Sequence, residues 1–278
     1  MLISVIIPTC NRNDFLAKCL NLLAPNIQGL TLEDFEIIVT DDGKENQAKD
    51  EVEEKFPYSK WVEGPKKGPA ANRNYGASLA KGDWLIFIDD DCQPDSDILR
   101  HYKKAIEDYD FKVYEGRTYA DRPKQRMDEE SPLNEDGGHL WSCNFMINKM
   151  FFYEIGRFNE LFPYAAMEDV ELRERILDKT KIKFIYSAGV LHTWRKVDDP
   201  VEKFRKAIES VKHYLKIRPK AINEFNSWLL IKQLLSSFVK RTLVEAYKFK
   251  FKGWKFAFQY HIFQIKLILL SKNIYRKG

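Results

Sequence analysis

Short apolar runs alternate with amphipathic stretches along the first hundred residues. The apolar runs predict four strands, which span Leu2–Ile7, Phe35–Thr40, Lys60–Glu63 and Trp84–Ile88. Two helices are predicted between them, from Asp14 to about Leu23 and from Gly68 to about Ala80. Alternation of this kind is typical of βαβ units, so the sequence predicts an α/β fold with a mainly parallel sheet flanked by helices.

The pattern is less regular after residue 100. Further strands are predicted at Lys112–Tyr119, Trp141–Asn148 and Ile182–Tyr186, the last of which leads to Val190–Arg195, and a helix is predicted at Glu168–Asp178. Arg122–Gly138 is polar and rich in proline and charge, which predicts a loop. Beyond Pro200 the pattern is helical. We therefore expect a catalytic domain over residues 1–200 and a helical extension over residues 201–278.

Charge is distributed unevenly between these two parts. Residues 1–200 contain 27 Lys and Arg against 37 Asp and Glu, whereas residues 201–278 contain 18 against 4. An acidic body with a basic tail suggests that the tail faces an anionic partner. Nucleic acid and a membrane surface are both candidates at this point.

The tail mixes its basic residues with aromatic ones. From Trp228 onward it has 11 Lys and Arg and one acid, Glu245. Its longest stretch without these charges, Phe256–Ile265, is far shorter than the roughly 20 apolar residues that span a bilayer. A basic amphipathic helix favours an anionic membrane surface, here through residues 228–278. The alternative is that these helices pack on the catalytic domain or on a second subunit, as in a homodimer.

The cysteines and the N-terminal segment indicate in which cellular compartment the protein is expected. The four cysteines are scattered, with no CxxC pair, at Cys10, Cys19, Cys92 and Cys143. They are typical of reduced thiols in a cytoplasmic protein. The apolar run at the N-terminus lacks a basic region before it and a cleavage site after it, so no signal peptide is predicted. We expect a cytoplasmic protein, peripheral at the inner face of the cell membrane.

Carboxylates follow two of the predicted strands. Asp41 and Asp42 come after the second strand, and Asp89, Asp90 and Asp91 come directly after the fourth. In open α/β sheets ligands bind at the carboxyl ends of the strands. Three packed carboxylates repel one another, which favours a bound cation, although an acidic cluster before a helix is the alternative.

Several segments together resemble the family 2 glycosyltransferases with the GT-A fold. They are VIIPTCNR (5–12), TDDG (40–43), GPAANRNYGA (68–77), FIDDDC (87–92), MEDVEL (167–172) and LHTW (191–194). Their order and spacing match the family over about residues 2–195. The resemblance implies a Rossmann-like GT-A sheet. It also implies inverting transfer of a sugar from a nucleotide-diphosphate donor, with a UDP-sugar favoured, to a glycan or lipid-linked glycan during surface polysaccharide or glycolipid synthesis.

The resemblance assigns a metal and a nucleotide site. Asp91 is the expected direct ligand of Mn²⁺ or Mg²⁺, Asp89 lies nearer the ribose or the metal waters, and His192 joins the metal or diphosphate. These hard ions prefer carboxylate oxygens. Asp90 is the intervening residue, without a firm role. The remaining nucleotide-binding residues are expected to be Pro8, Thr9, Asn11, Arg12, Asp41, Asp42 and Arg73, with Asp41 accepting from a uracil imide.

The resemblance also assigns the acceptor side. Asp169 is the expected general base that removes the acceptor proton, although acids are also favoured in a first helical turn for dipole reasons. Trp141, Asn144 and Glu168 are expected near the acceptor, while buried packing explains Trp141 equally well. Relatives often have a further acid after the aspartates. This chain has Cys92 there, so no metal ligation is assigned to that position.

Two other functions fit the sequence less well. A nucleic-acid-binding protein would explain the basic tail but not the ordered acidic motifs, and no known nucleic-acid-binding signature is present. A catalytically silent relative that acts as an assembly partner would not need Asp89, Asp91 and Asp169. We therefore expect an enzyme that does not bind nucleic acid.

Overall fold

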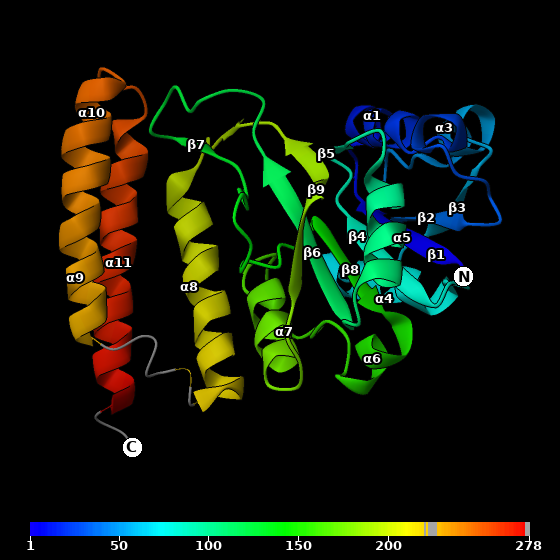
Figure 1. Cartoon of the computed structure of the whole chain (residues 1–278). Helices are drawn as coiled ribbons and strands as arrows, with labels where there is room; N and C mark the ends of the chain where they lie inside the picture. The colour runs from blue at the N-terminus through cyan, green and yellow to red at the C-terminus, as the bar shows by residue number, and fades with distance from the viewer. Residues whose placement is uncertain (220, 222–226, 276–278) are drawn as a thin grey trace. The chain divides into compact units, whose positions relative to one another are not determined.

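The computed structural model of the chain describes residues 1–219, 221 and 227–275 (Figure 1). It forms two compact units. The first consists of Met1–Asp121, Pro132–Leu161 and Glu168–Thr193, and the second of Arg122–Ser131, Phe162–Met167 and Trp194–Gly278. The domain boundary expected at residue 200 stays a prediction, since contacts alone do not define independently folding parts.

The first unit contains one sheet of eight strands in the order β3-β2-β1-β4-β8-β6-β9-β5 (Figure 1). They span β1 Ile3–Thr9, β2 Phe35–Asp41, β3 Ser59–Glu63, β4 Trp84–Ile88, β5 Cys92–Pro94, β6 Val113–Tyr119, β8 Asn144–Asn148 and β9 Lys183–His192. The strands β3, β2, β1 and β4 are parallel neighbours, as are β6 and β9. β8 runs antiparallel to β4 and β6, and β5 to β9. The predicted mainly parallel α/β fold is confirmed.

Helices cover both faces of this sheet (Figure 1). They span α1 Asn13–Leu22, α2 Pro25–Gln28, α3 Lys49–Lys55, α4 Pro69–Leu79, α5 Ile98–Asp108, α6 Lys149–Glu154 and α7 Glu168–Leu177. In β1, Val5 belongs to a buried apolar cluster that includes residues of α1, α3 and α5, while Ile6 belongs to a second cluster that includes residues of α4, α6 and α7. Burial on both faces explains why β1 is a continuous apolar run rather than an alternating one.

The close approach of α4 to β1 requires a glycine. A Cβ on Gly76 would lie 2.5 Å from Cγ2 of Ile6, closer than carbon atoms pack. Gly76 therefore lets α4 lie directly on the sheet, and it is one helical turn from Arg73. This packing fixes the position of the Arg73 backbone, and so of its Cα atom, relative to the sheet.

The structure differs from the sequence expectations in two strands. The strand expected from Trp141 begins at Asn144, because the preceding residues form a turn in which Asn144 N–H donates to the Trp141 carbonyl. The strand expected at Ile182–Tyr186 is longer in the structure, where β9 has 10 residues and ends at His192. Its register with β6 shifts between Gly116 and Arg117. Such an irregularity interrupts the alternation of side chains along the pair, so the full length of β9 is not evident from the sequence pattern.

The second unit is mostly helical. Its elements span β7 Glu129–Glu130, β10 Arg195–Lys196, α8 Pro200–Ile217, α9 Ser227–Ser237, the π-helix η2 Phe238–Val244, α10 Glu245–Lys248 and α11 Trp254–Tyr275. The short strands β7 and β10 pair antiparallel, so the predicted loop at 122–138 contains a strand. Phe204 of α8 stacks on Phe263 of α11 at 5.1 Å between ring centroids. None of the helices in the described residues has the length and apolar character to cross a membrane.

Candidate active site

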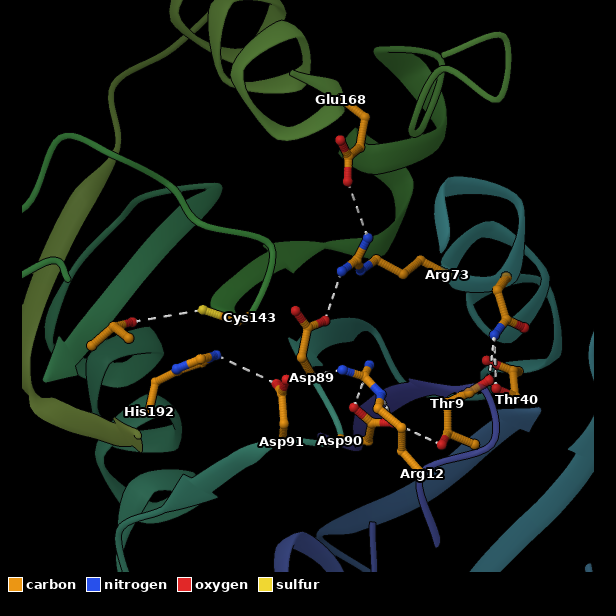
Figure 2. A network of polar contacts seen from close by, with 12 residues as sticks. Thr9, Arg12, Thr40, Arg73, Asp89, Asp90, Asp91, Cys143, Glu168 and His192 are labelled. Atoms are coloured by element: carbon orange, nitrogen blue, oxygen red, sulfur yellow. Dashed lines mark hydrogen bonds and ion pairs between the residues drawn. The ribbon is translucent and has the colours of Figure 1, made fainter. Parts of the chain in front are cut away.

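The parallel register brings three strand ends to one edge of the sheet. β1 lies between β2 and β4, with Thr9 beside Asp41 in the register, and β4 ends just before Asp89. The loop after β1 and the aspartates after β4 therefore lie together, as Figure 2 shows. This is the edge at which open α/β sheets bind ligands.

Asp90 is the most deeply buried of the three aspartates and holds the loop after β1. Its Oδ2 accepts from Thr9 Oγ1 at 2.7 Å and from Arg12 Nε at 3.0 Å. Burial raises the pKa of the Asp90 carboxyl to about 7, although Arg12 and Thr9 lower it. The role that the sequence left open for Asp90 is thus to anchor Arg12.

Asp91 lies between an arginine and a histidine. Arg12 Nη1 donates to its Oδ2 at 2.9 Å, and Nε2 of His192 lies 3.5 Å from its Oδ1 (Figure 2). Burial opposes the charge of Arg12, but Asp90 and Asp91 outweigh it and raise the pKa of the guanidinium. Asp91 and His192, both predicted for the metal, therefore meet Arg12, which was predicted to line the nucleotide.

Arg73 links the aspartates that follow β4 to the acidic pair that begins α7. It is 4% exposed, its Nη2 donates to Asp89 Oδ1 at 2.6 Å, and its Nη1 lies 3.5 Å from Glu168 Oε1 (Figure 2). Burial, and then Asp169, raise the pKa of Glu168 to about 7 despite Arg73. A single buried cation thus faces carboxylates from two distant chain segments.

Asp169, the expected base, lies beside Glu168 in the first turn of α7. Its Oδ1 accepts from the Val170 N–H at 2.8 Å. Burial raises the pKa of the Asp169 carboxyl, although backbone N–H groups and Arg73 lower it. A raised pKa suits a group that accepts a proton during a reaction at neutral pH.

The carboxylates after β2 organise the neighbouring loops. Asp41 is fully buried and accepts from the N–H groups of Gly43 at 2.8 Å and Ala48 at 2.7 Å. Asp42 accepts from the N–H groups of Lys66 at 2.8 Å and Gly68 at 3.1 Å, which sets the entry to α4. The nucleotide contacts expected for Asp41 and Asp42 stay predictions.

The other predicted residues lie around this edge. Pro8 and Asn11 belong to the end of β1 and its loop, where Asn11 has a φ of 55°. Asn144 is buried, accepts from Tyr102 OH at 2.8 Å and donates to two backbone carbonyls. Trp141 Nε1 donates to the Leu133 carbonyl at 3.0 Å, and its ring stacks on His139. These contacts support structural roles for Asn144 and Trp141, and their acceptor contacts stay predictions.

Glu115 is a positioning residue that the sequence analysis missed. This buried carboxylate of β6 accepts from Leu140 N–H at 2.9 Å, from Gly138 N–H and from Asn134 Nδ2. It therefore holds the segment that leads to Trp141. The available signal was an acid in the interior of a predicted strand, where an unpaired charge is costly.

Three side chains could hold a metal ion. Donor atoms of Asp91, Cys92 and His192 all lie within 4.8 Å of one another. His192 Nδ1 makes a 3.0 Å hydrogen bond with the Thr193 carbonyl. Because a carbonyl only accepts, Nδ1 donates in this contact, and Nε2 is the ring nitrogen that lies 3.5 Å from Asp91 Oδ1. Carboxylate and imidazole fit the predicted divalent ion. The pKa of the Cys92 thiol is raised by its contact with Cys143 and by burial.

Comparison with known proteins identifies the class to which this fold and site belong. The family model described as glycosyl transferase family 2 matches residues 4–162, more than half of the chain. The chain is a member of glycosyl transferase family 2.

Individual relatives agree with this class. An uncharacterized glycosyltransferase of Haemophilus influenzae is 28% identical over 80% of this chain and 80% of its own length. A poly(ribitol-phosphate) beta-glucosyltransferase of Bacillus spizizenii is 32% identical over 48% of this chain. A GalNAc(5)-diNAcBac-PP-undecaprenol beta-1,3-glucosyltransferase of Campylobacter jejuni is 35% identical over 32% of this chain. The matches span 22% of the Bacillus protein and 29% of the Campylobacter protein.

Solved structures support the fold. A crystal structure of S. aureus TarS 1-349 in complex with UDP superposes with a TM-score of 0.58 at 19% identity, covering 77% of this chain and 66% of that one. A complex of the same protein with UDP-GlcNAc has a TM-score of 0.58 at 20% identity, covering 74% and 64%. The predicted GT-A architecture is confirmed.

Proposed function

We propose that this chain transfers a sugar, with inversion, from a UDP-sugar to a hydroxyl of a glycan or lipid-linked glycan in surface polysaccharide or glycolipid synthesis. The observation that carries the proposal is the bridge made by Arg73, which contacts Asp89 on the donor side and Glu168 beside Asp169. A transferase needs the donor phosphates and the acceptor base close together, and this arrangement supplies both. Solved neighbours with UDP and UDP-GlcNAc favour the uracil nucleotide.

On the donor side, Asp91, His192 and Asp89 would hold Mn²⁺ or Mg²⁺. When bound, the ion neutralises charge on the leaving diphosphate. Arg12 contacts Asp90 and Asp91 and lies on the loop expected to line the nucleotide, so its guanidinium is within the site to meet phosphate oxygens. Arg73 is held in place by Asp89 and adds a second cation for the leaving group.

On the acceptor side, Asp169 would accept the proton of the attacking hydroxyl. Glu168 is buried next to it, and burial raises the pKa of both carboxyls, while the charge of Asp169 raises that of Glu168 further. The acceptor oxygen attacks the anomeric carbon on the face opposite the diphosphate. One displacement with one base gives inversion.

The second unit would attach the enzyme to an anionic membrane at the cytoplasmic face. Aromatic side chains are exposed in α10 and in the turn that follows it, with Tyr247 at 89% and Phe251 at 66%. Exposed lysines alternate with them at Lys248, Lys250, Lys252 and Lys255. Aromatic and basic side chains that alternate along one short segment suit the interface of an anionic bilayer. Residues 276–278 of the predicted membrane segment lie outside the described residues.

Binding to a membrane surface agrees with the name of one relative, the Campylobacter enzyme, which includes a PP-undecaprenol-linked substrate. The alternative is that this surface joins two copies of the chain. Sedimentation of the full-length protein with and without anionic vesicles separates the two, since a dimer forms without lipid.

The experiment that tests the proposed function is a donor assay. The full-length chain is incubated with Mn²⁺ and each of UDP-, GDP- and dTDP-sugars, and the released nucleotide diphosphate and the anomeric configuration of the product are measured. Release of UDP with inversion supports the proposal. Absence of turnover with every donor and acceptor, in a protein that also fails to bind any nucleotide, would contradict it.

A further inference from the structure

Cys92 lies in the metal site although the family pattern gave it no role there. It begins β5 and is paired with His192 at the end of the antiparallel neighbour β9. Directly opposed residues of an antiparallel pair place their side chains on the same face, with Cβ atoms about 4.5–5.5 Å apart. The register of β5 against β9 therefore brings a thiol to the histidine that faces Asp91.

The spacing of the donor atoms fits a metal ion. Ligands at about 2.0 Å for nitrogen or oxygen and about 2.3 Å for sulfur stand roughly 3.5 Å apart around a tetrahedral ion. Nε2 of His192 and Oδ1 of Asp91 are already 3.5 Å apart. The whole set lies within 4.8 Å. The largest separation between two donor atoms therefore exceeds the separation around a tetrahedral ion by at most roughly 1.3 Å.

The imidazole is also prepared as a ligand. The Thr193 carbonyl accepts from Nδ1 of His192 at 3.0 Å, which orients the ring so that Nε2 lies toward Asp91. A hydrogen bond of this kind orients most metal-binding histidines in proteins. All three side chains are buried, which shields the ligands from competing water.

We propose that Cys92 joins Asp91 and His192 as a protein ligand of this metal site, so that the site takes a thiophilic divalent ion, such as Zn²⁺ or Co²⁺, in preference to Mg²⁺. The proposal deepens the proposed function, on which it rests for Asp91 and His192. Thiolate selects zinc and cobalt over magnesium, which prefers an all-oxygen shell. On binding, the S–H bond breaks, the sulfur keeps the electron pair and donates it to the ion, and the proton leaves to solvent.

The alternative is that Cys92 is only a packed thiol. It contacts the thiol of Cys143, and both are buried. Cys143 is also 3.9 Å from Thr118 Oγ1. The two cysteines are therefore separable by substitution.

The test is a titration of the full-length, metal-free protein with Co²⁺ in a non-thiol reductant, followed by absorption spectroscopy. Thiolate ligation gives a sulfur-to-cobalt charge-transfer band in the near ultraviolet. The band is expected in the wild-type protein, in Cys143→Ser and in the exposed-thiol control Cys10→Ser, and it is expected to be lost in Cys92→Ser. Loss of a ligand should weaken Co²⁺ binding by at least about 10–100-fold, the effect of losing a group that merely orients a ligand.

Three results would overturn the proposal: no band in the wild-type protein, a band that persists in Cys92→Ser, or a band lost only in Cys143→Ser. If Cys92→Ser does not fold, X-ray absorption of the zinc-loaded wild-type protein replaces it. A sulfur neighbour at about 2.3 Å supports the proposal and a shell of only nitrogen and oxygen refutes it. Mn²⁺-dependent UDP binding is measured in parallel. Its persistence without a sulfur signal would refute the role of Cys92 alone and leave the transferase proposal intact.

Discussion

Arg73 donates to Asp89 across a 2.6 Å contact in which the arginine is almost fully buried. Burial opposes the charge of Arg73, but the surrounding acids outweigh it and raise the pKa of the guanidinium. The cation is permanent, so the carboxylates around it are held in place before any substrate arrives. The charged groups at the ends of the strands are therefore already oriented before substrate binds, as electrostatic catalysis requires.

Replacing Arg73 with Met should destabilise the fold. The change leaves Asp89 and Glu168 without their shared cation, and removing one partner of a buried ion pair costs about 3–5 kcal/mol. Urea unfolding of the full-length protein measures the loss. The control is Lys55→Met, which removes an exposed pair with Glu51 and should leave unfolding unchanged. Equal stability of the two variants would contradict the role of Arg73.

Asp91→Ala should abolish metal-dependent binding of UDP. Asp91 is the carboxylate that meets both His192 and Arg12, so its loss removes the expected direct metal ligand. Calorimetric titration of UDP with and without Mn²⁺ measures the effect. Asp97→Ala removes a partly exposed acid that pairs with His101 and should bind UDP normally. Retained affinity and unchanged metal dependence in Asp91→Ala would refute the ligand assignment.

Asp169→Asn should keep donor binding and lose transfer by a factor on the order of 10²–10⁴, the usual contribution of a general base. The amide keeps the shape of the side chain but cannot accept the acceptor proton. Steady-state transfer rates and UDP affinity are measured on the same preparation. Transfer near the wild-type rate would show that another group is the base.

Titration of Glu168 should lower the free energy of unfolding as pH rises. Its pKa is raised from 4.5 to about 7 in the folded protein, so the folded state binds more protons than the unfolded state between these values. Its contribution is therefore present below pH 4.5 and lost as pH rises through about 7. Over that window Glu168→Gln should gain up to about 3 kcal/mol relative to wild type. Denaturant unfolding at several pH values checks the sign, and a parallel pH dependence of the two proteins would contradict it.

The exposed aromatic residues before α11 should be needed for membrane binding. Tyr247→Ser with Phe251→Ser removes apolar area without changing charge, so flotation with anionic vesicles should fall. Met150→Ser is the matched control, because Met150 is 82% exposed but belongs to the first unit. Vesicle binding that is unaffected by the double variant would contradict the membrane proposal.

The sequence predicts the fold and the position of the site because both depend on local patterns. Apolar runs that end in acids define the strands and the edge where Asp41 and Asp89 lie. The pairing of Cys92 with His192 could not be predicted in this way, since it depends on the register of two strands far apart in the chain. The burial of Asp90 and the loop held by Glu115 depend in the same way on tertiary packing.

The most direct test of the account is calorimetric titration of the full-length protein with UDP, GDP and dTDP, each with and without Mn²⁺. We predict that UDP binds, that Mn²⁺ strengthens its binding, and that GDP and dTDP bind more weakly. Complete indifference to all three nucleotides, with and without the metal, would contradict the proposal that this site transfers sugar from a nucleotide donor.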